Sequence, residues 1–197
     1  MCSELDRQPL RARLKAAPGL AAALAVAATA AAAFAGSGEI PSLYDALATA
    51  FPGADIERRT YTLTAEQQAE AARLAGEPLP HTVIFAYHAS LDGRPVGTAY
   101  FDAHRVRTLP QTLMIIVEPD GRLRSIEVLS FREPPQYKPS AAWLNQFRGR
   151  CLDEDLQLRR GIQGITGATL TARATTKAAR RALALHAVLS GIPADAK

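Results

Sequence analysis

The spacing of apolar residues divides the chain into helix-like and strand-like segments. In "SLYDALATAF", which begins at Ser42, the residues Leu43, Leu47 and Phe51 recur at helical spacing, and Ser42 is a typical helix N-cap. The next segment, "DIERRTYTL", is strand-like. Thr64 is the N-cap of a second predicted helix, "AEQQAEAARLAG", which ends at its glycine.

Two longer segments each predict a β-hairpin, because strand-like runs flank a turn sequence. "HTVIFAYHASLDGRPVGTAYFDA" turns at Asp92-Gly93, and "QTLMIIVEPDGRLRSIEVLSF" turns at Pro119-Asp120-Gly121. The proline-rich loop "REPPQYKP" follows, then a short helix capped by Ser140 and a last helix at roughly 170–190. The predicted fold class is α+β: an antiparallel sheet of two hairpins flanked by helices, with an N-terminal signal or anchor helix.

The N-terminal segment indicates export. No charged residue occurs in residues 16–38, and this alanine-rich run follows the basic stretch "RARLK". As a helix at ~1.5 Å per residue it is long enough for the ~30 Å core of a bilayer. It is only weakly apolar, and "AFA" at residues 33–35 has the form of a signal-peptidase site. A cleaved signal and an uncleaved anchor both place the rest of the chain outside the cytoplasmic membrane, and a buried alanine-rich helix is the third alternative.

Charge and composition exclude some classes of function. The formal net charge is +4 over 197 residues, and the first 15 residues contribute two of these charges. The remainder is too weakly basic to indicate a nucleic-acid partner. The four histidines, His81, His88, His104 and His186, have no metal-ligand spacing, so we predict no metal site and no catalytic residue.

The stretch "QGITGATLT" at residues 163–171 carries the clearest chemical signal. Its glycines allow tight turns and close approach, and its threonines supply hydroxyl groups at a helix start, where free N–H groups favour phosphate. It is neither a Walker A loop, because Ala168 follows Gly167, nor the GxGxxG of a Rossmann unit. From these residues alone, an ordinary N-capped helix after a glycine turn is an equal alternative.

"GITGATLT", preceded by two hairpins and by "FREPPQY", resembles the FMN-binding domain of the small flavoprotein subunits of Na+-translocating NADH:quinone reductase and Rnf complexes. The resemblance covers about residues 40–190. It implies two regions: a basic segment with a signal or anchor helix at 1–38, and an FMN-binding domain at 39–197.

In that family a flavin transferase joins FMN from FAD, through a phosphodiester, to the threonine that closes a D-G-x-S/T-G-A-T motif. The resemblance therefore implies FMN as the cofactor and Thr169 as the attachment residue. The family's aspartate falls on Gln163, which carries no charge. The other cofactor-binding residues implied by the match are Gly164, Thr166, Gly167, Ala168 and Thr171.

The resemblance implies an extracytoplasmic flavoprotein that relays electrons within a membrane redox complex, and not an enzyme that turns over a substrate by itself. Its partners would be subunits of that complex, the flavin transferase and, if the helix is uncleaved, the membrane. The alternative is a module that binds FMN or another phosphate ligand noncovalently, which Gln163 favours.

Other residues near the motif have two interpretations each. Glu133 matches a glutamate near the flavin in the family, or is a surface residue. Tyr137, Trp143 and Phe147 are candidates for contact with the flavin ring, or for the core. The basic side of the last helix is either a solvated face or a surface for phosphate or a partner; its residues are Arg173, Lys177, Arg180 and Arg181.

Overall fold

A computed structural model describes residues 42–191 of the chain. The whole segment 1–38, with the predicted signal or anchor helix, therefore lies outside the described residues. Within residues 42–191, no helix has the length and apolar character needed to cross a membrane.

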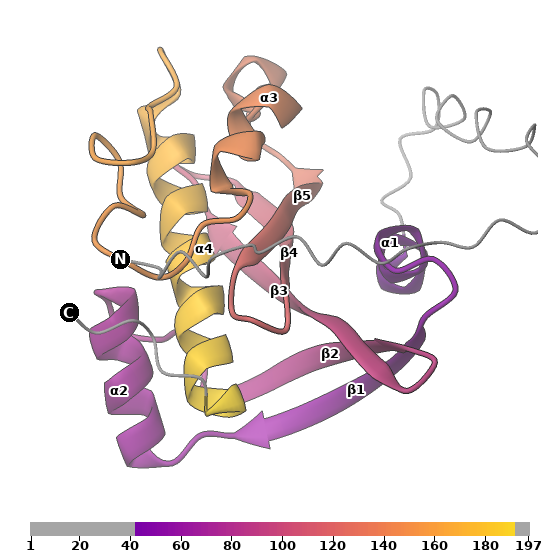
Figure 1. Cartoon of the computed structure of the whole chain (residues 1–197). Coiled ribbons are helices and arrows are strands. Elements are labelled where there is room, and N and C mark those ends of the chain that lie inside the picture. Colours follow the sequence, from indigo (N-terminus) through magenta and orange to yellow (C-terminus); the bar gives the residue numbers. More distant parts are fainter. Residues whose placement is uncertain (1–41, 192–197) are drawn as a thin grey trace, which may run out of the picture. The chain divides into compact units, whose positions relative to one another are not determined.

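The centre of the domain is one antiparallel sheet of five strands in the order β1-β2-β3-β4-β5, each paired with its neighbours in sequence (Figure 1). The strands are β1 (Asp55–Thr62), β2 (Val83–Leu91), β3 (Arg94–Arg105), β4 (Pro110–Val117) and β5 (Leu123–Phe131). The α+β class and both hairpins are confirmed. The sheet is larger than two hairpins, because the strand-like segment at β1 pairs along its whole length with β2.

Four α-helices accompany the sheet. They are α1 (Leu43–Ala50), α2 (Ala65–Ala75), α3 (Ala141–Leu144) and α4 (Thr169–Ser190). Two short 3-10 turns, η1 (Pro135–Tyr137) and η2 (Asn145–Phe147), flank α3. The helix predicted at about 170–190 is thus confirmed almost residue for residue.

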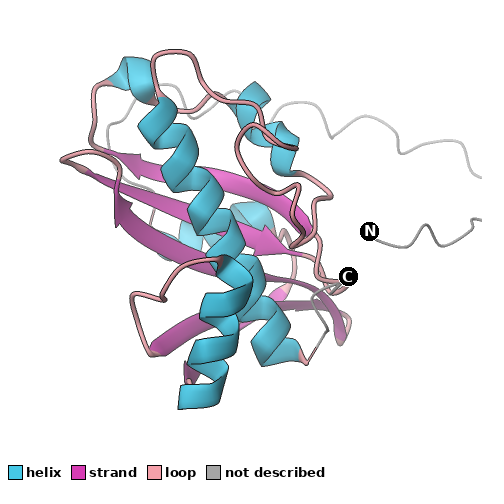
Figure 2. Ribbon diagram, turned by 90° about the vertical axis from the view of Figure 1, so that its left-hand side faces the viewer, coloured by secondary structure: helices cyan, strands magenta, loops and turns pink. Residues whose placement is uncertain are grey.

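The helices cover both faces of the sheet. In Figures 1 and 2, α4 lies across the strands with α2 beside it, and α1 lies on the opposite side. Successive residues of a strand face opposite sides, so β4 serves two cores. Leu113 and Ile115 belong to the core beneath α2 and α4, whereas Met114 and Ile116 belong to the core beneath α1.

Local signals define the ends of the first two helices. Ser42 accepts a hydrogen bond from the backbone N–H of Asp45, and the Asp45 carboxylate accepts one in return from the Ser42 backbone. Thr64 and Gln67 form the same reciprocal pair at the start of α2. Such capping boxes satisfy N–H groups that the helix itself leaves without partners, which explains why both starts were predictable.

Arg180 ties α4 to two other parts of the domain. Its guanidinium donates hydrogen bonds to the carbonyls of Leu74 and Ala75 at the end of α2, each at 3.0 Å. It also donates to the carbonyls of Asp153 and Leu156, at 2.8 and 3.3 Å. One side chain of α4 therefore fixes both α2 and the loop that precedes α4.

Buried polar side chains connect α4 to the sheet. The Tyr100 hydroxyl lies 3.1 Å from Nδ1 of His186, and both side chains are buried. Burial, and to a smaller extent the charge of His88, lowers the pKa of His186 to about 4. The folded protein therefore holds a neutral imidazole at this position at neutral pH.

This histidine makes stability depend on pH. Below about pH 6.5 the unfolded chain protonates His186 while the folded chain does not, so the free energy of unfolding falls as pH decreases from about 6.5 to about 4. The slope from this one group is at most about 1.4 kcal/mol per pH unit. Urea unfolding at several pH values, followed by circular dichroism, measures it. His186→Gln should flatten the slope whatever its effect on stability at pH 7, and an unchanged slope would refute this assignment.

Candidate functional site at the start of α4

The motif residues form a tight turn directly before α4. Gly167 has φ +78°, a left-handed conformation that favours glycine, and the Ala168 backbone N–H donates to the Ile165 carbonyl at 3.1 Å. Ala168 is the N-cap, and Thr169 is the first residue of the helix. Gly164 needs neither a positive φ nor close approach, because no atom lies within 4 Å of a Cβ added there.

The N-terminus of α4 differs from those of α1 and α2. No side chain caps it, since Ala168 occupies the N-cap, and its first turn contains no acidic residue. The alternative of an N-capped helix after a glycine turn holds for the turn and the helix, but no side chain supplies the cap. The first N–H groups and the positive end of the helix dipole remain available for an anion, which is the environment that a phosphate group requires.

The predicted cofactor-binding residues fall into two groups by exposure. Thr169 is exposed, as are three other residues of the turn, Gly164, Thr166 and Gly167. Ala168 and Thr171 are buried, with 4% and 1% of their surface exposed. The Thr169 side chain is thus accessible to a modifying enzyme, whereas Thr171 packs into the domain.

The turn forms one wall of a cavity of about 240 Å³. The opposite wall comes from the connection between β3 and β4 and from the proline-rich loop after β5. The structure therefore brings Glu133 and Tyr137 to the motif, as the resemblance implied for Glu133. The lining residues are Val106, Arg107, Glu133, Tyr137, Gly167, Ala168, Thr169, Leu170 and Thr171.

Glu133 stabilises the cavity wall formed by the β3–β4 connection. Its Oε1 accepts hydrogen bonds from the backbone N–H groups of Leu109 and Thr108, both at 2.8 Å, and of Arg107 at 3.2 Å. The bonds from Leu109 and Thr108 are the main cause of its lowered pKa. Glu133 is buried, not a surface residue, and it keeps the β3–β4 connection folded against the cavity.

The short helix α3 and the 3-10 turn η2 hold the beginning of the motif. The Trp143 indole N–H donates to the Gln163 carbonyl at 2.8 Å, and the Gln163 backbone N–H donates to the Gln146 side chain at 2.9 Å. Phe147 is fully buried and packs edge-to-face against Trp143 with ring centroids 5.3 Å apart. Phe147 is therefore a core residue, and Trp143 positions the motif loop. The Gln163 residue remains exposed while both its backbone groups are bound.

The basic side of α4 is largely occupied by contacts within the domain. Arg181 forms two hydrogen bonds of 2.9 Å to Asp102 and also pairs with Glu77, which in turn pairs with Lys177 at 2.6 Å. Burial alone would raise the pKa of Asp102, but hydrogen bonds from His104 and Arg181 outweigh it, and the pKa lies at about 2. The interpretation of this side as a solvated face is therefore wrong for Arg180 and Arg181.

A larger cavity, of about 750 Å³, lies elsewhere. It is lined mainly by β2, β3 and the segment before β2, including the exposed side chains of Val83 and Phe85. None of the motif residues lines it.

Within residues 42–191, no group of three His, Cys, Asp or Glu side chains is placed to hold a metal ion.

Residues 109–184 match the model of the FMN-binding domain family. The matched segment runs from the edge of β4 through β5 and α3 into α4, and it contains the motif turn, Glu133 and Tyr137. This match supports an FMN-binding domain in this part of the chain, with FMN as its cofactor. A comparison with curated proteins finds no match.

The geometry of the motif loop fits the group that the family implies. A phosphate would meet the uncapped end of α4, and the cavity beside Thr169 has a tyrosine, Tyr137, in its wall. The residues that would hold FMN are therefore the turn at residues 164–168, Thr169 and the cavity walls.

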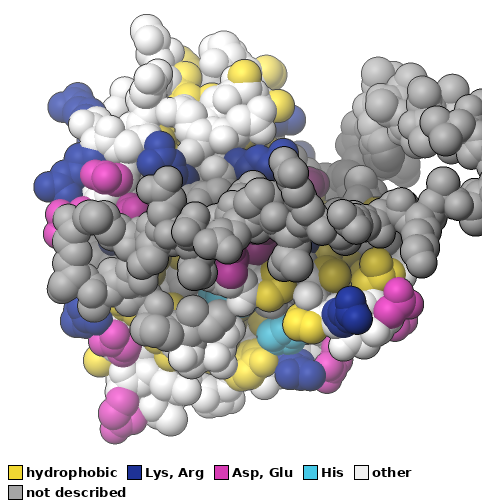
Figure 3. All heavy atoms as spheres, in the orientation of Figure 1, with side chains coloured by type: hydrophobic (Ala, Val, Ile, Leu, Met, Phe, Trp, Pro, Cys, Tyr) yellow, Lys and Arg dark blue, Asp and Glu magenta, His cyan; other side chains and the backbone are white. Residues whose placement is uncertain are grey.

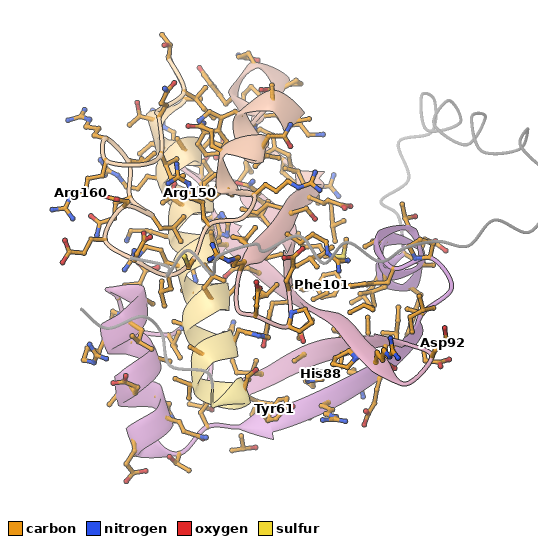
Figure 4. The ribbon with its side chains drawn as sticks, viewed as in Figure 1. Tyr61, His88, Asp92, Phe101, Arg150 and Arg160 are labelled. Carbon is orange, nitrogen blue, oxygen red and sulfur yellow. The ribbon has the colours of Figure 1, made fainter. Side chains whose placement is uncertain are left out.

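The conformation of the loop before the motif depends on Gly161, which no sequence pattern indicated. A Cβ at Gly161 would lie 2.5 Å from the Asp155 carbonyl oxygen and 3.2 Å from the Arg150 guanidinium. Gly161 also donates to the Asp155 carbonyl at 2.8 Å and accepts from Arg150 at 2.9 Å. Arg150 points into this loop whereas Arg160 points away from the domain (Figure 4).

We expect Gly161→Ala to destabilise the protein by about 1–3 kcal/mol, because the added methyl group forces the backbone of this loop apart. Gly164→Ala is the matched control, since a Cβ there meets nothing, and it should change stability by less than about 1 kcal/mol. Thermal unfolding compares the two variants. Equal melting temperatures for both would contradict the packing described for this loop.

Proposed function

We propose that this protein is an extracytoplasmic flavoprotein that relays electrons in a membrane-associated redox chain, and that its FMN is joined to Thr169 by a phosphodiester. The observation that carries the proposal is the position of Thr169. It is an exposed residue at the uncapped start of α4, within a segment that matches the FMN-binding domain family.

The surroundings of Thr169 support a phosphoester at this oxygen. The negative charge of a phosphodiester at a helix N-terminus is favourable by about 0.3–1 kcal/mol. The buried neighbours, Ala168 and Thr171, hold the backbone on both sides, so the threonine has a defined position. When bound, the isoalloxazine ring of FMN supplies the electron-transfer chemistry, and the protein positions the ring.

The attachment reaction requires a second enzyme. The Thr169 hydroxyl is a weak nucleophile, and among residues 42–191 no side chain hydrogen-bonds to it as a base. In the proposed transfer, Oγ1 of Thr169 attacks the phosphorus of the FMN half of FAD. The bond from that phosphorus to the bridging oxygen breaks, AMP leaves, and the hydroxyl proton passes to a base of the flavin transferase. This chain contributes the acceptor oxygen and an exposed turn.

The proposed location rests on the sequence before the domain. The uncharged run at 16–38 follows a basic stretch, which is typical of exported or anchored proteins. A covalent link has a physical purpose there, because a dissociated flavin would be lost by diffusion outside the cell membrane.

Noncovalent binding of FMN is the second candidate, and Gln163 favours it. The family has aspartate at this position, and the amide of Gln163 cannot supply a negative charge during transfer. The backbone of Gln163 is held by Trp143 and Gln146, and its exposed side chain takes no part in these two bonds. Glutamine in place of aspartate therefore changes the charge at this position and leaves the fold unchanged.

Thr169→Ala tests the covalent link. When the full chain is co-expressed with a flavin transferase and separated on a denaturing gel, the wild-type band should fluoresce as a flavin and the Thr169→Ala band should not. The substitution removes the acceptor oxygen at an exposed position, so the fold should persist, which circular dichroism checks.

Thr166→Ala is the matched control, because Thr166 is an exposed threonine in the same turn. It should keep the fluorescence, and Thr169→Ser should keep it in part. Fluorescence that survives in Thr169→Ala would exclude this attachment residue. A wild-type protein that is yellow before denaturation and colourless after it would select noncovalent binding.

A further inference from the structure

A third cavity, of about 450 Å³, is lined in part by Thr169. Thr169 lines it together with α4 residues one and two turns further on, the end of α2 and the loop at residues 157–159. The cavity is therefore a neighbour of the 240 Å³ cavity, and Thr169 belongs to the walls of both. Four cationic side chains and one carboxylate line it: Arg159, Arg173, Lys177, Arg180 and Glu77.

Two of these cations are already engaged and two are not. Lys177 pairs with Glu77 at 2.6 Å, and Arg180 spends its hydrogen bonds on backbone carbonyls. Arg159 and Arg173 are exposed, and within residues 42–191 neither side chain makes a hydrogen bond or an ion pair. The wall of the cavity thus holds two positive charges with no internal partner.

Both arginines line the same cavity as Thr169. Arg173 lies four residues after Thr169, which is the spacing that puts two helical side chains on the same face. Arg159 lies in a small loop closed by a hydrogen bond from its N–H to the Ile162 carbonyl at 2.9 Å and by the bridge between Leu158 and Ile162. Figure 3 shows Lys and Arg side chains, with Asp and Glu side chains among them, on the side of the molecule where Figure 4 labels Arg160 of the same loop.

We propose that Arg159 and Arg173 form a phosphate-binding site that holds the phosphate of FMN beside Thr169. Guanidinium groups bind phosphate oxygens through charge-assisted and often bidentate hydrogen bonds, and two arginines match the charge of a phosphate monoester. The cavity of 240 Å³ on the other side of Thr169 is then left for the flavin ring. This inference rests on the proposed function, and it applies to a free phosphate monoester as well as to a phosphodiester.

The test compares FMN with riboflavin, which has the same ring and no phosphate. The full chain, produced without a flavin transferase, is titrated with each flavin while flavin fluorescence is followed. Wild type should bind FMN at least tenfold more tightly than riboflavin. In Arg159→Gln/Arg173→Gln the affinity for FMN should fall about 10- to 100-fold, the loss expected for charge-assisted hydrogen bonds, and the affinity for riboflavin should stay unchanged.

The matched control is Arg160→Gln. Arg160 is an exposed arginine in the same loop, but it pairs with Glu154 at 3.2 Å and does not line the cavity. It should bind FMN as wild type does. Inorganic phosphate should compete with FMN for binding and should not compete with riboflavin. The single variant Arg173→Gln provides a second, milder substitution.

The outcomes separate this inference from the proposed function. If wild type binds FMN and the double variant keeps the same preference for FMN over riboflavin, the arginine site is refuted and the flavoprotein assignment stands. If wild type binds neither flavin and acquires none with a transferase, both are refuted. A double variant that loses FMN and riboflavin equally also overturns the site, because the arginines would then act on the ring or on the fold.

Discussion

The guanidinium of Arg180 is the contact on which the arrangement of the flavin-binding end depends. It joins α4 to the last carbonyls of α2 and to the carbonyls of residues 153 and 156, parts of the chain that local sequence does not bring together. Because this loop leads directly into the motif turn, its position determines where Thr169 lies. Hydrogen bonds from a charged donor are each worth about 1.5–3 kcal/mol, so one side chain accounts for much of the order in this region.

The start of α4 departs from the capping pattern of the first two helices. The first two helices satisfy their free N–H groups with capping boxes, each cap being worth about 1 kcal/mol. The longest helix within residues 42–191, α4, has Ala168 as its N-cap and so begins without a capping side chain. Its N–H groups have the electrostatic character that a phosphate group complements, and in the proposed function the exposed threonine at this point supplies the oxygen for a phosphoester. In this account, the cofactor takes the place of the missing cap.

The parts of the fold that depend on local sequence were predictable, and those that depend on distant partners were not. The turn at Asp92-Gly93 has φ +51° and +74°, a conformation that this dipeptide favours, so the hairpin could be read directly. The pairing of β1 with β2 and the ion pair between Arg181 and Asp102, 79 residues apart, leave no pattern within a short window. The motif turn could likewise be located from its local sequence. The hydrogen bonds that hold Glu133 in the cavity wall could not be predicted, because their partners are residues 107–109.

The proposal that Thr169 carries FMN is tested most directly by mass spectrometry of the protein isolated from its native cells. Trypsin cleavage after Arg160 and Arg173 gives a peptide of residues 161–173, which contains the whole motif turn. This peptide should carry one added FMN group, and fragmentation should assign the group to Thr169. An unmodified peptide from protein that still contains flavin, or an FMN group on any other residue, would contradict it.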